Sequence, residues 1–562
     1  MNILAISCHY HDSAACLIRD GKIAAAAQEE RFNRIKGCPD FPLRAANYCL
    51  QAGGCTAFDL DYVCFYEKPF LKFARMLFTH LRAYPRSWRG FSDSLPLWLS
   101  GRLNFARAIR DDFGFNGDIL YIKHHLSHAA SAFLASPFEE SAILTADSVG
   151  EEATMARGSG SGNRIRISRE LRFPDSLGLL YTAVTTYLGF AANEGEGTVM
   201  GLAACGKPAF LEKMREAVVL KPDGSLRLNP DFFDFTGSGP MYGPRFTKLF
   251  GPARLPEEPV DQRHGDMAAT LQKLTEDVIL AAARDLHRET KSRNLSLAGG
   301  LFLNCVANHK ILEETEFENV FIQPAAGDAG GALGAACYAY FSLLGNARTP
   351  CMPDAYLGPE YSPSVLRRAL LKESLDFKEL PDDELPRFTA QRLAEGKIIG
   401  WFQGRMEFGP RALGNRSILA DPRDPDMKDL LNRKVKKREP FRPYAPAVLD
   451  EAAHEYFHLR GKSPFMLLAA RVREDKKSLI PAVTHVDGTA RIQTVSKDAN
   501  PRFWSLIKAF GDLTGVPMVI NTSFNLRGEP IACSPEDAIS GYRRSGMDCL
   551  VLGNYFVERK AG

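Results

Sequence analysis

Short apolar segments separated by polar turns dominate the first thirty residues. Residues 3–6, 14–18 and 23–27 are apolar, and polar residues fill the turns between them. Runs of this length bounded by turn residues are typical of strands, so the segment predicts a β-hairpin with a third strand. Residues 142–157 repeat this strand–turn–strand pattern, because an apolar run is followed by an acidic turn and then by a second predicted strand. The repetition predicts a duplicated α/β fold with a nucleotide between its halves.

A short strand followed by an alanine-rich helix is predicted at residues 119–135. His124 and His128 are four residues apart, so a helix places both imidazoles on one face. Two neutral imidazoles so placed can share one metal ion. An isolated pair is equally compatible with histidines bonded to carbonyl groups or water. Further ligands are needed to decide, and Asp147 and Asp328 are the candidates.

Glycine-rich segments follow several of the apolar runs. Gly299 and Gly300 connect a predicted strand to a helix, and residues 323–334 form a second such turn. Glycines at these turns let backbone N–H groups approach a nucleotide at a helix N-terminus. Four glycines in residues 191–207 predict a flexible loop that faces the substrate. Residues 60–115, which are basic and aromatic, predict an irregular insertion that contains helices.

Clustered prolines between residues 350 and 363 indicate a domain boundary. We therefore expect one domain at residues 1–354 and a smaller α/β domain at residues 355–562. A single basic run is usually a solvated surface. Here several arginines lie on loops braced by Gly and Pro, which predicts an anion pocket because guanidinium groups bind phosphate bidentately. The loops are residues 409–417, 432–443, 489–494 and 521–529.

Composition narrows the class of protein. The apolar content of 45% and charged content of 24% are those of an ordinary globular protein. A net charge of +3 gives no basic field for nucleic acid, and no apolar run approaches the roughly 20 residues that span a bilayer. The 12 cysteines are scattered without a Cys-x-x-Cys pair, which is typical of reduced thiols. We expect a cytoplasmic enzyme with no nucleic-acid partner and no membrane partner.

Several motifs in combination resemble a known family. They are His11-Asp12-Ser13-Ala14-Ala15, Glu29-Glu30-Arg31-Phe32, His124-His125-Leu126-Ser127-His128, Met200-Gly201-Leu202-Ala203, Gly409-Pro410-Arg411-Ala412-Leu413-Gly414 and Asn521-Thr522-Ser523-Phe524-Asn525. Nearly end to end, the chain resembles the O-carbamoyltransferases, which include nodulation-factor, cephamycin and nebramycin carbamoyltransferases.

The resemblance implies two catalytic domains. The first resembles the universal tRNA threonylcarbamoyl-transferring protein, with an actin/hexokinase-like duplicated fold. It would hold ATP, with Mg²⁺ as a further companion of the nucleotide, and one divalent metal ion, usually Fe²⁺. By motif position, the metal ligands would be His124, His128, Asp147 and Asp328, and the ATP contacts His11, Gly299, Gly300, Asn304 and Asp328.

The second domain resembles the enzyme that makes threonylcarbamoyl-adenylate, a YrdC-like α/β fold. It would bind carbamoyl phosphate through Arg411, Lys436, Arg442, Arg491, Asn521 and Arg527, of which Arg411, Lys436 and Arg442 would be catalytic.

The implied reaction moves a carbamoyl group from carbamoyl phosphate, through carbamoyl-adenylate, to a hydroxyl group of an acceptor. His11 is the expected general base for that hydroxyl, since its pKa lies naturally near the working pH. The acceptor would be an antibiotic, an oligosaccharide or another small polyol, and a homodimer is a further expectation. Family members commonly carry lysine where this chain has Thr198. The resemblance therefore gives less support for a phosphate or acceptor contact at this position.

Other classes of protein share parts of this pattern. An actin-like small-molecule kinase would share the duplicated hairpins but would not need His124 with His128, or the arginine-rich domain. A tRNA threonylcarbamoyl transferase would share the metal site, yet the modest net charge and the fused second domain argue against it. A non-catalytic binding protein would not need two pockets.

Overall fold

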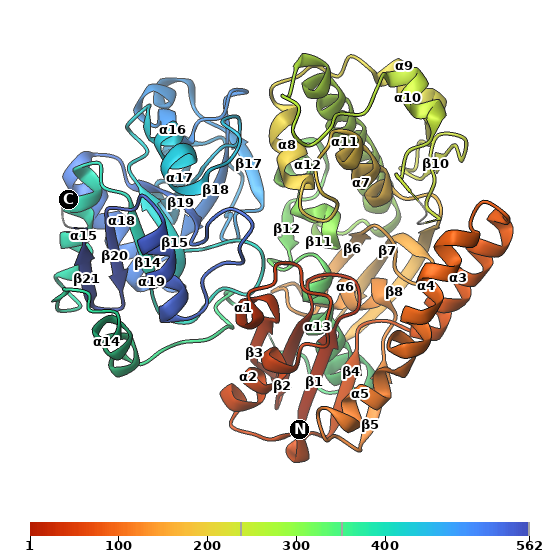
Figure 1. The fold of residues 1–562 in the computed structure, drawn as a ribbon, viewed down its shortest axis with the longest axis horizontal. Helices are drawn as coiled ribbons and strands as arrows, with labels where there is room; N and C mark the ends of the chain where they lie inside the picture. Colours follow the sequence, from red (N-terminus) through yellow and green to blue (C-terminus); the bar gives the residue numbers. More distant parts are fainter. Residues whose placement is uncertain (237–238, 350–351, 560–562) are drawn as a thin grey trace. The chain divides into compact units, whose positions relative to one another are not determined.

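The computed structural model describes residues 1–236, 239–349 and 352–559, which form two compact units (Figure 1). Unit 1 comprises Met1–Glu29 and Gly37–Met352, and unit 2 comprises Glu30–Lys36 and the chain from Pro353 onward. A short N-terminal segment therefore belongs to the compact unit built mainly from the C-terminal third. Pro350, one of the prolines at the predicted boundary, lies outside the described residues.

Unit 1 contains two five-stranded sheets. The first has the order β3-β2-β1-β4-β5. Its strands are β1 (Asn2–Ser7), β2 (Ala14–Arg19), β3 (Lys22–Gln28), β4 (Tyr62–Phe65) and β5 (Asp118–Tyr121). Strand β1 pairs antiparallel with β2 and parallel with β4. Its side chains from Ile3 to Ile6 are buried, as expected for the central strand of a sheet covered on both faces.

The second sheet repeats the first. Its order is β12-β11-β6-β7-β8, again with two antiparallel pairs on one side of the central strand and two parallel pairs on the other. The strands are β6 (Glu140–Ala146), β7 (Ala153–Ser161), β8 (Arg164–Arg172), β11 (Asn294–Ala298) and β12 (Asn319–Ile322). This internal repeat confirms the predicted duplicated α/β fold.

Two small-residue helices connect the halves of unit 1. Helix α6 (His124–Phe133) follows the first sheet but packs on β6 and β11 of the second. Helix α13 (Asp328–Cys337) follows the second sheet but packs on β1 and β2 of the first. The helices also contact each other, and a Cβ at Gly334 would lie 1.8 Å from the Ser127 carbonyl oxygen. Small residues therefore allow the two helices to approach each other closely.

The prediction of a flexible loop at residues 191–207 was wrong. Helix α8 (Glu196–Ala203) occupies the middle of this segment. Its buried Val199 and Leu202 lie on a helix that packs against α11 (Gln262–Thr290). This packing outweighs the low helix propensity of the two glycines inside the helix.

The insertion predicted at residues 60–115 is mostly helical. It contains α3 (Pro69–Ala83), α4 (Trp88–Ser100) and α5 (Phe105–Asp111) after strand β4. Among the residues that the structure describes, no helix is both long enough and apolar enough to cross a bilayer.

Unit 2 is built on one mixed nine-stranded sheet with the order β13-β21-β20-β14-β15-β19-β16-β18-β17. Its strands are β13 (Lys378–Glu379), β14 (Ile399–Phe402), β15 (Arg416–Ala420), β16 (Ala445–Leu449), β17 (Leu468–Arg471), β18 (Thr489–Val495), β19 (Met518–Ser523), β20 (Cys549–Leu552) and β21 (Tyr555–Glu558). The helices are α1 (Glu30–Asn33), α14 (Pro363–Lys372), α15 (Leu385–Ala394), α16 (Met427–Leu431), α17 (Ala453–Tyr456), α18 (Pro501–Thr514) and α19 (Pro535–Arg544). Of the basic segments predicted as loops, residues 409–417 lead from β14 to β15, and residues 432–443 lie between α16 and β16. The prediction of a loop at residues 489–494 was wrong, because these residues lie on β18, and residues 521–523 lie on β19.

Candidate functional site

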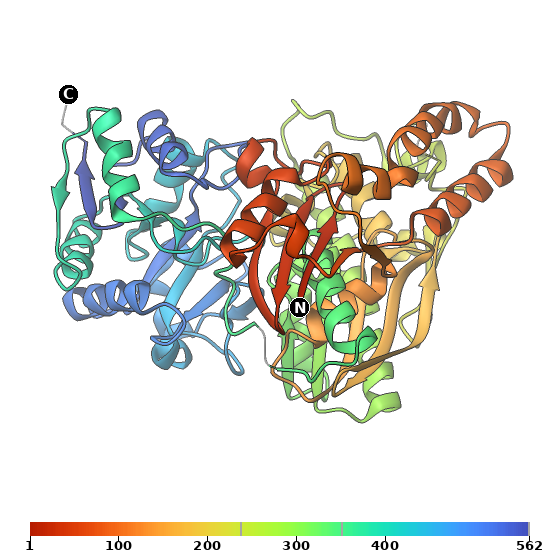
Figure 2. The same cartoon turned by 90° about the horizontal axis from the view of Figure 1, so that it is seen from below.

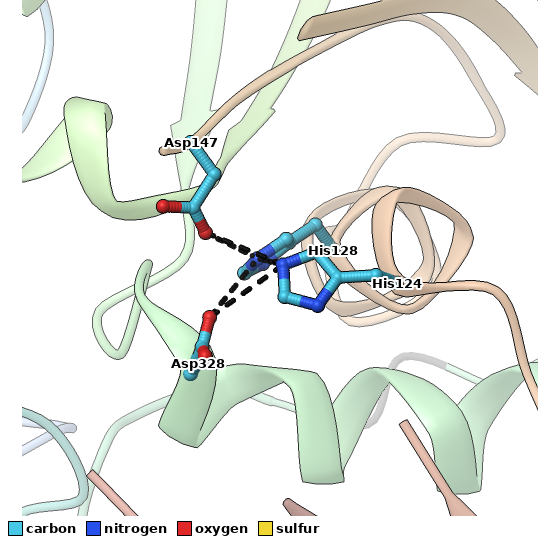
Figure 3. Close-up of side chains that lie close together, drawn as sticks. All are labelled: His124, His128, Asp147 and Asp328. Carbon is cyan, nitrogen blue, oxygen red and sulfur yellow. Dashed lines mark hydrogen bonds and ion pairs between the residues drawn. The ribbon is translucent and has the colours of Figure 1, made fainter. Parts of the chain in front are cut away.

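Four buried side chains from both halves of unit 1 converge on one point (Figure 3). His124 and His128 come from the start of α6, and their Nε2 atoms are 3.1 Å apart. Asp147 follows strand β6 directly, and its Oδ2 lies 3.4 Å from His124 Nε2 and 2.9 Å from His128 Nε2. Asp328 is the first residue of α13, and its Oδ1 lies 3.6 and 3.7 Å from the same nitrogens.

This geometry fits a single metal ion. Metal–ligand bonds of about 2.0–2.2 Å place neighbouring ligand atoms roughly 3–3.6 Å apart, close to the separations found here. One donor atom of each residue lies within 4.8 Å of every other. Imidazole nitrogens and carboxylate oxygens are ligands that divalent transition metals accept. Helices α6 and α13 each follow one sheet and pack on the other, which explains why residues so distant in sequence meet.

The cluster is balanced in charge. Burial lowers the pKa of His124, but Asp328 and Asp147 outweigh this effect and raise the pKa to about 10. Burial opposes ionisation of Asp147 as well, and the two histidines nevertheless hold its pKa well below the usual range. Two imidazolium groups thus offset two carboxylates. A divalent cation held by neutral imidazoles would offset the same two carboxylates, so this donor set suits a doubly charged ion.

Three further residues support the first turn of α6. The Glu67 carboxylate lies 3.8 Å from His124 Nδ1 and accepts a 2.6 Å hydrogen bond from the buried Lys72 ammonium. Glu151 accepts the backbone N–H of His124 at 3.0 Å, which places a negative charge at the helix N-terminus. Neither Glu67 nor Lys72 was predicted from the sequence, because nothing in their spacing relates them to His124, more than fifty positions away.

His11 lies on the loop between β1 and β2, beside the four-residue cluster. Its Nδ1 is 3.0 Å from Asp12 Oδ2, and its Nε2 is 3.8 Å from Asp328 Oδ2. Burial lowers the pKa of His11, but Asp328 and Asp12 outweigh this effect and raise it to about 10. In this state the imidazole is a cation suited to phosphate oxygens. The His11 imidazole can accept a proton near neutral pH only when another positively charged group offsets the charge of the Asp328 carboxylate.

The predicted ATP contacts Gly299, Gly300 and Asn304 lie at the end of β11. Gly299 has a φ of +102°, and a Cβ there would meet the Ala146 carbonyl oxygen at 2.1 Å. A Cβ on Gly300 would lie 3.2 Å from Asp147 Oδ1, so the glycine pair borders the metal-ligand cluster. The Asn304 side chain caps α12 (Cys305–Glu314) by accepting the Ala307 N–H. Gly299 and Gly300 therefore lie beside the His/Asp cluster, whereas the side-chain contacts of Asn304 are with α12 and with Gln272 of α11.

Unit 2 gathers the predicted cations around the end of α16. Lys436 ends a π-helical turn that continues α16, and such turns are frequent at functional sites. Its buried ammonium donates to the Ser523 carbonyl at 2.5 Å and to Asn525 Oδ1 at 2.8 Å. Burial and the charges of Arg438 and Arg442 lower its pKa well below the usual range.

Arg442 experiences the same excess of positive charge. Burial, Arg438 and Arg491 lower its pKa to about 10, although Glu439 lies 3.7 Å away and opposes this shift. Exposed Arg527 donates to the Lys437 carbonyl at 3.1 Å. Like charges held this closely are a feature that a bound anion would stabilise.

Asn521 lies near this cluster, because it is two residues before Ser523, whose carbonyl oxygen accepts a hydrogen bond from Lys436. The buried Asn521 side chain donates to the Ala412 carbonyl at 3.2 Å and to Gln493 at 2.7 Å. Its buried Oδ1 has no hydrogen-bond partner in the described part of the chain, which leaves an acceptor for a ligand donor. Arg411 precedes Ala412, and Arg491 lies two residues from Gln493 on β18.

The N-terminal segment of unit 2 contacts the loop that carries Arg411. Arg31 pairs with Glu30 at 2.8 Å and donates to the Gly409 carbonyl at 2.9 Å. Arg34 donates to the Pro530 and Ile531 carbonyls, each at 2.7 Å. Residues 30–36 thus contact one predicted anion-binding loop at Gly409 and the residues that directly follow another, at 530 and 531. These contacts were not predicted from the sequence.

Comparison with protein families covers most of the sequence. Residues 2–337 match the family model described as the carbamoyltransferase N-terminus, and residues 390–559 match the carbamoyltransferase C-terminus. The chain belongs to the carbamoyltransferase family. It is therefore a transferase, and the resemblance identified from the sequence motifs is confirmed.

Two individual relatives match this carbamoyltransferase over nearly the whole chain, and a third matches about half of it. It is 44% identical to the uncharacterized Synechocystis protein sll1178, over 100% of this chain and 97% of the relative. It is 39% identical to nodulation protein NolNO of Sinorhizobium fredii, over 98% of this chain and 79% of the relative. A 3'-hydroxymethylcephem-O-carbamoyltransferase of Amycolatopsis lactamdurans is 37% identical over 48% of this chain and 49% of its own.

One position of this carbamoyltransferase differs from the expected family pattern. Thr198, where lysine is common, is buried on α8, and its backbone N–H donates to the Gly195 carbonyl at 2.9 Å. The buried hydroxyl side chain supplies no positive charge. A contact that a lysine at this position would make with a phosphate or an acceptor therefore has no counterpart in this chain.

Proposed function

We propose that this carbamoyltransferase is an ATP-dependent O-carbamoyltransferase. It would move a carbamoyl group from carbamoyl phosphate, through carbamoyl-adenylate, to a hydroxyl group of a small molecule or sugar. The observation that carries the proposal is the pairing, within one chain of this family, of a buried His/Asp cluster in unit 1 with a basic cluster in unit 2. A simple kinase would need only the first.

The first step would take place in unit 2. Water would cleave carbamoyl phosphate to carbamate and phosphate, releasing one proton. Lys436, Arg442 and Arg491 supply positive charge for the phosphate oxygens, with Arg411 and Arg527 on bordering loops. Asn521 Oδ1 could accept an N–H of the carbamoyl group, since that buried acceptor needs a donor. Preorganised cations stabilise charge that develops on the leaving phosphate.

The second and third steps would take place in unit 1. Carbamate would attack the α-phosphorus of ATP, displacing pyrophosphate and giving carbamoyl-adenylate. The Gly299-Gly300 turn and Asn304 would border the nucleotide, and His11 would contact its phosphate oxygens. The acceptor hydroxyl would then attack the carbamoyl carbon, its proton passing to His11 and AMP leaving. A metal ion held by His124, His128, Asp147 and Asp328 would supply positive charge beside the phosphates.

Two lines of support bear on the cofactors and the acceptor. A mixed set of imidazole and carboxylate ligands suits Fe²⁺, whereas structural zinc typically has a closed set of thiolate ligands. Mg²⁺ would accompany ATP. The name of the Amycolatopsis relative states O-carbamoylation of a hydroxymethylcephem, and NolNO is a nodulation protein. We therefore propose an alcohol acceptor from natural-product or oligosaccharide tailoring, a cytoplasmic location, and residues 1–354 and 355–562 as the two functional domains.

Product analysis tests this proposal. The purified protein, loaded with Fe²⁺, is incubated with carbamoyl phosphate, ATP, Mg²⁺ and a panel of hydroxyl acceptors. Formation of AMP, pyrophosphate and phosphate supports transfer through an adenylate. ADP as the nucleotide product would instead support an actin-like kinase and contradict the proposal.

A further inference from the structure

The helical hairpin formed by α3 and α4 projects from the sheets of unit 1 (Figures 1 and 2). Its first helix starts at Pro69 beside the metal-ligand cluster, and its tip lies at residues 84–88. Buried Lys72 and Trp98 fasten the base of the hairpin to the unit. The rest of the hairpin exposes side chains that the proposed reaction does not use.

Large apolar side chains are concentrated on the outer surface of this hairpin. Phe70, Phe78 and Leu81 are exposed and lie on one face of α3, because their spacing of eight and eleven residues falls within one sector of a helix. Tyr84 at the tip and Trp88 at the start of α4 are also exposed, Trp88 by 61%. Contiguous exposed apolar residues on a helix indicate an interaction surface.

The same segment is strongly basic. Residues 68–110 contain nine Lys and Arg and a single Asp, whereas the whole chain has a net charge of only +3. Arg82, Arg86 and Arg89 are exposed around the aromatic tip. The remainder of the chain is therefore slightly acidic, and positive charge is concentrated where the apolar side chains are.

We propose that the α3–α4 hairpin is a docking surface for an anionic lipid bilayer. Trp and Tyr favour the membrane–water interface, and Phe and Leu can enter the acyl region while arginines bind anionic headgroups. A second copy of the chain is a poorer occupant, because a two-fold contact would bring the same arginines together. This proposal departs from the sequence-based expectation of no membrane partner. That expectation relied on the absence of a bilayer-spanning run, which a helix that binds at the membrane surface does not need.

Vesicle binding by the full chain tests this docking surface. Large vesicles of phosphatidylcholine alone, or of equal parts phosphatidylcholine and phosphatidylglycerol, are mixed with the protein and sedimented at low and high salt. Binding to the anionic vesicles should be roughly tenfold or more tighter than to the neutral ones and should weaken as salt rises. Fluorescence quenching by brominated lipid should reach Trp88 and disappear in Trp88→Phe.

Variants identify the surface responsible. The double substitution Phe78→Ser/Trp88→Ser should weaken anionic-vesicle binding roughly tenfold or more, because it removes two exposed apolar anchors. Arg82→Gln/Arg86→Gln/Arg89→Gln should weaken binding and reduce its salt dependence. The matched control Phe58→Ser removes an aromatic side chain that is 90% exposed elsewhere in unit 1 and should bind normally. All these side chains are exposed, so circular dichroism should show unchanged folding.

Three results would overturn the proposal. One is the absence of binding to anionic vesicles by the unaltered chain. Another is binding that neither hairpin variant weakens. The third is an oligomer, detected by light scattering, that Phe78→Ser/Trp88→Ser dissociates in a protein that does not bind vesicles, which would assign the surface to self-association.

Discussion

The buried centre of unit 1 and the basic cluster of unit 2 both concentrate charge, but they treat it in opposite ways. In unit 1, His124 and His128 face Asp147 and Asp328, so each charge has an opposite neighbour. In unit 2, Lys436 and Arg442 face further cations that lower the pKa of both side chains. The first arrangement balances its charges within the protein, whereas we propose that an anionic ligand balances the second.

This difference predicts different responses to substitution. Removing one member of a buried, opposite-charge cluster leaves an uncompensated charge, which costs about 3–5 kcal/mol. Removing one member of a like-charge cluster relieves repulsion in the ligand-free protein. Unit 1 variants should therefore lose stability and function together, and unit 2 variants should lose function alone.

The largest effect is expected from His128→Ala. Loss of one imidazole from the four-residue cluster should reduce bound metal to near zero and lower the free energy of unfolding by about 3–5 kcal/mol. Metal analysis and urea denaturation measure the two effects. His125→Asn is the matched control, because His125 bonds Thr145 at 2.8 Å rather than joining the cluster. Undiminished metal in His128→Ala would contradict the assignment.

His11→Ala should separate the two reactions of unit 1. If His11 takes the proton of the acceptor hydroxyl, transfer should fall roughly 10²–10⁴-fold while carbamoyl-adenylate still forms. Quench-flow measurement of carbamoyl-adenylate and of the carbamoylated product resolves the two steps. Equal losses in both steps would assign His11 to nucleotide binding, in line with the positive charge that Asp328 and Asp12 favour.

Arg442→Ala should slow phosphate release from carbamoyl phosphate by roughly 10–100-fold. The lost charge-assisted contact is worth about 1.5–3 kcal/mol. The melting temperature without ligand should stay equal or rise, because a like charge near Lys436 is gone. Arg433→Ala, which changes an exposed arginine of the same basic run, is the control. A lower melting temperature of Arg442→Ala would contradict the proposed difference between the two clusters.

The smallest effect is expected from Glu67→Gln. Loss of the carboxylate near His124 Nδ1 should weaken metal affinity by about 10–100-fold, the usual effect of a group that orients a ligand. The double variant Glu67→Gln/Lys72→Met restores charge balance, so its stability should recover while its metal affinity stays low. Recovery of both properties would assign Glu67 a purely structural role.

The sequence predicted the elements of unit 1 that depend on local pattern. Alternating apolar runs and turn residues predicted β1, β2 and β3, and the helical spacing of His124 and His128 predicted a shared face. The convergence of Asp147 and Asp328 on that face depends on the crossed packing of α6 and α13. No local pattern encodes that packing, so the sequence pattern offered Asp147 and Asp328 only as candidates, and the family resemblance selected them as ligands.

Features fixed by long-range contacts were not predicted. Helix α8 forms because buried Val199 and Leu202 pack on α11 despite unfavourable glycines. Glu67 and Lys72 are joined by a buried ion pair, but their sequence neighbours give no sign of proximity to α6. The grouping of Glu30–Lys36 with unit 2 likewise depends on hydrogen bonds to residues 409, 530 and 531.

Rescue by preformed carbamoyl-adenylate tests the two-site account most directly. Arg442→Ala and His128→Ala are each given acceptor with either carbamoyl phosphate plus ATP or synthetic carbamoyl-adenylate, and carbamoylated product is measured in a single turnover. The account predicts that the adenylate restores transfer in Arg442→Ala, whose defect precedes adenylate formation, but not in His128→Ala. Failure of rescue in a folded, metal-loaded Arg442→Ala protein would contradict the account.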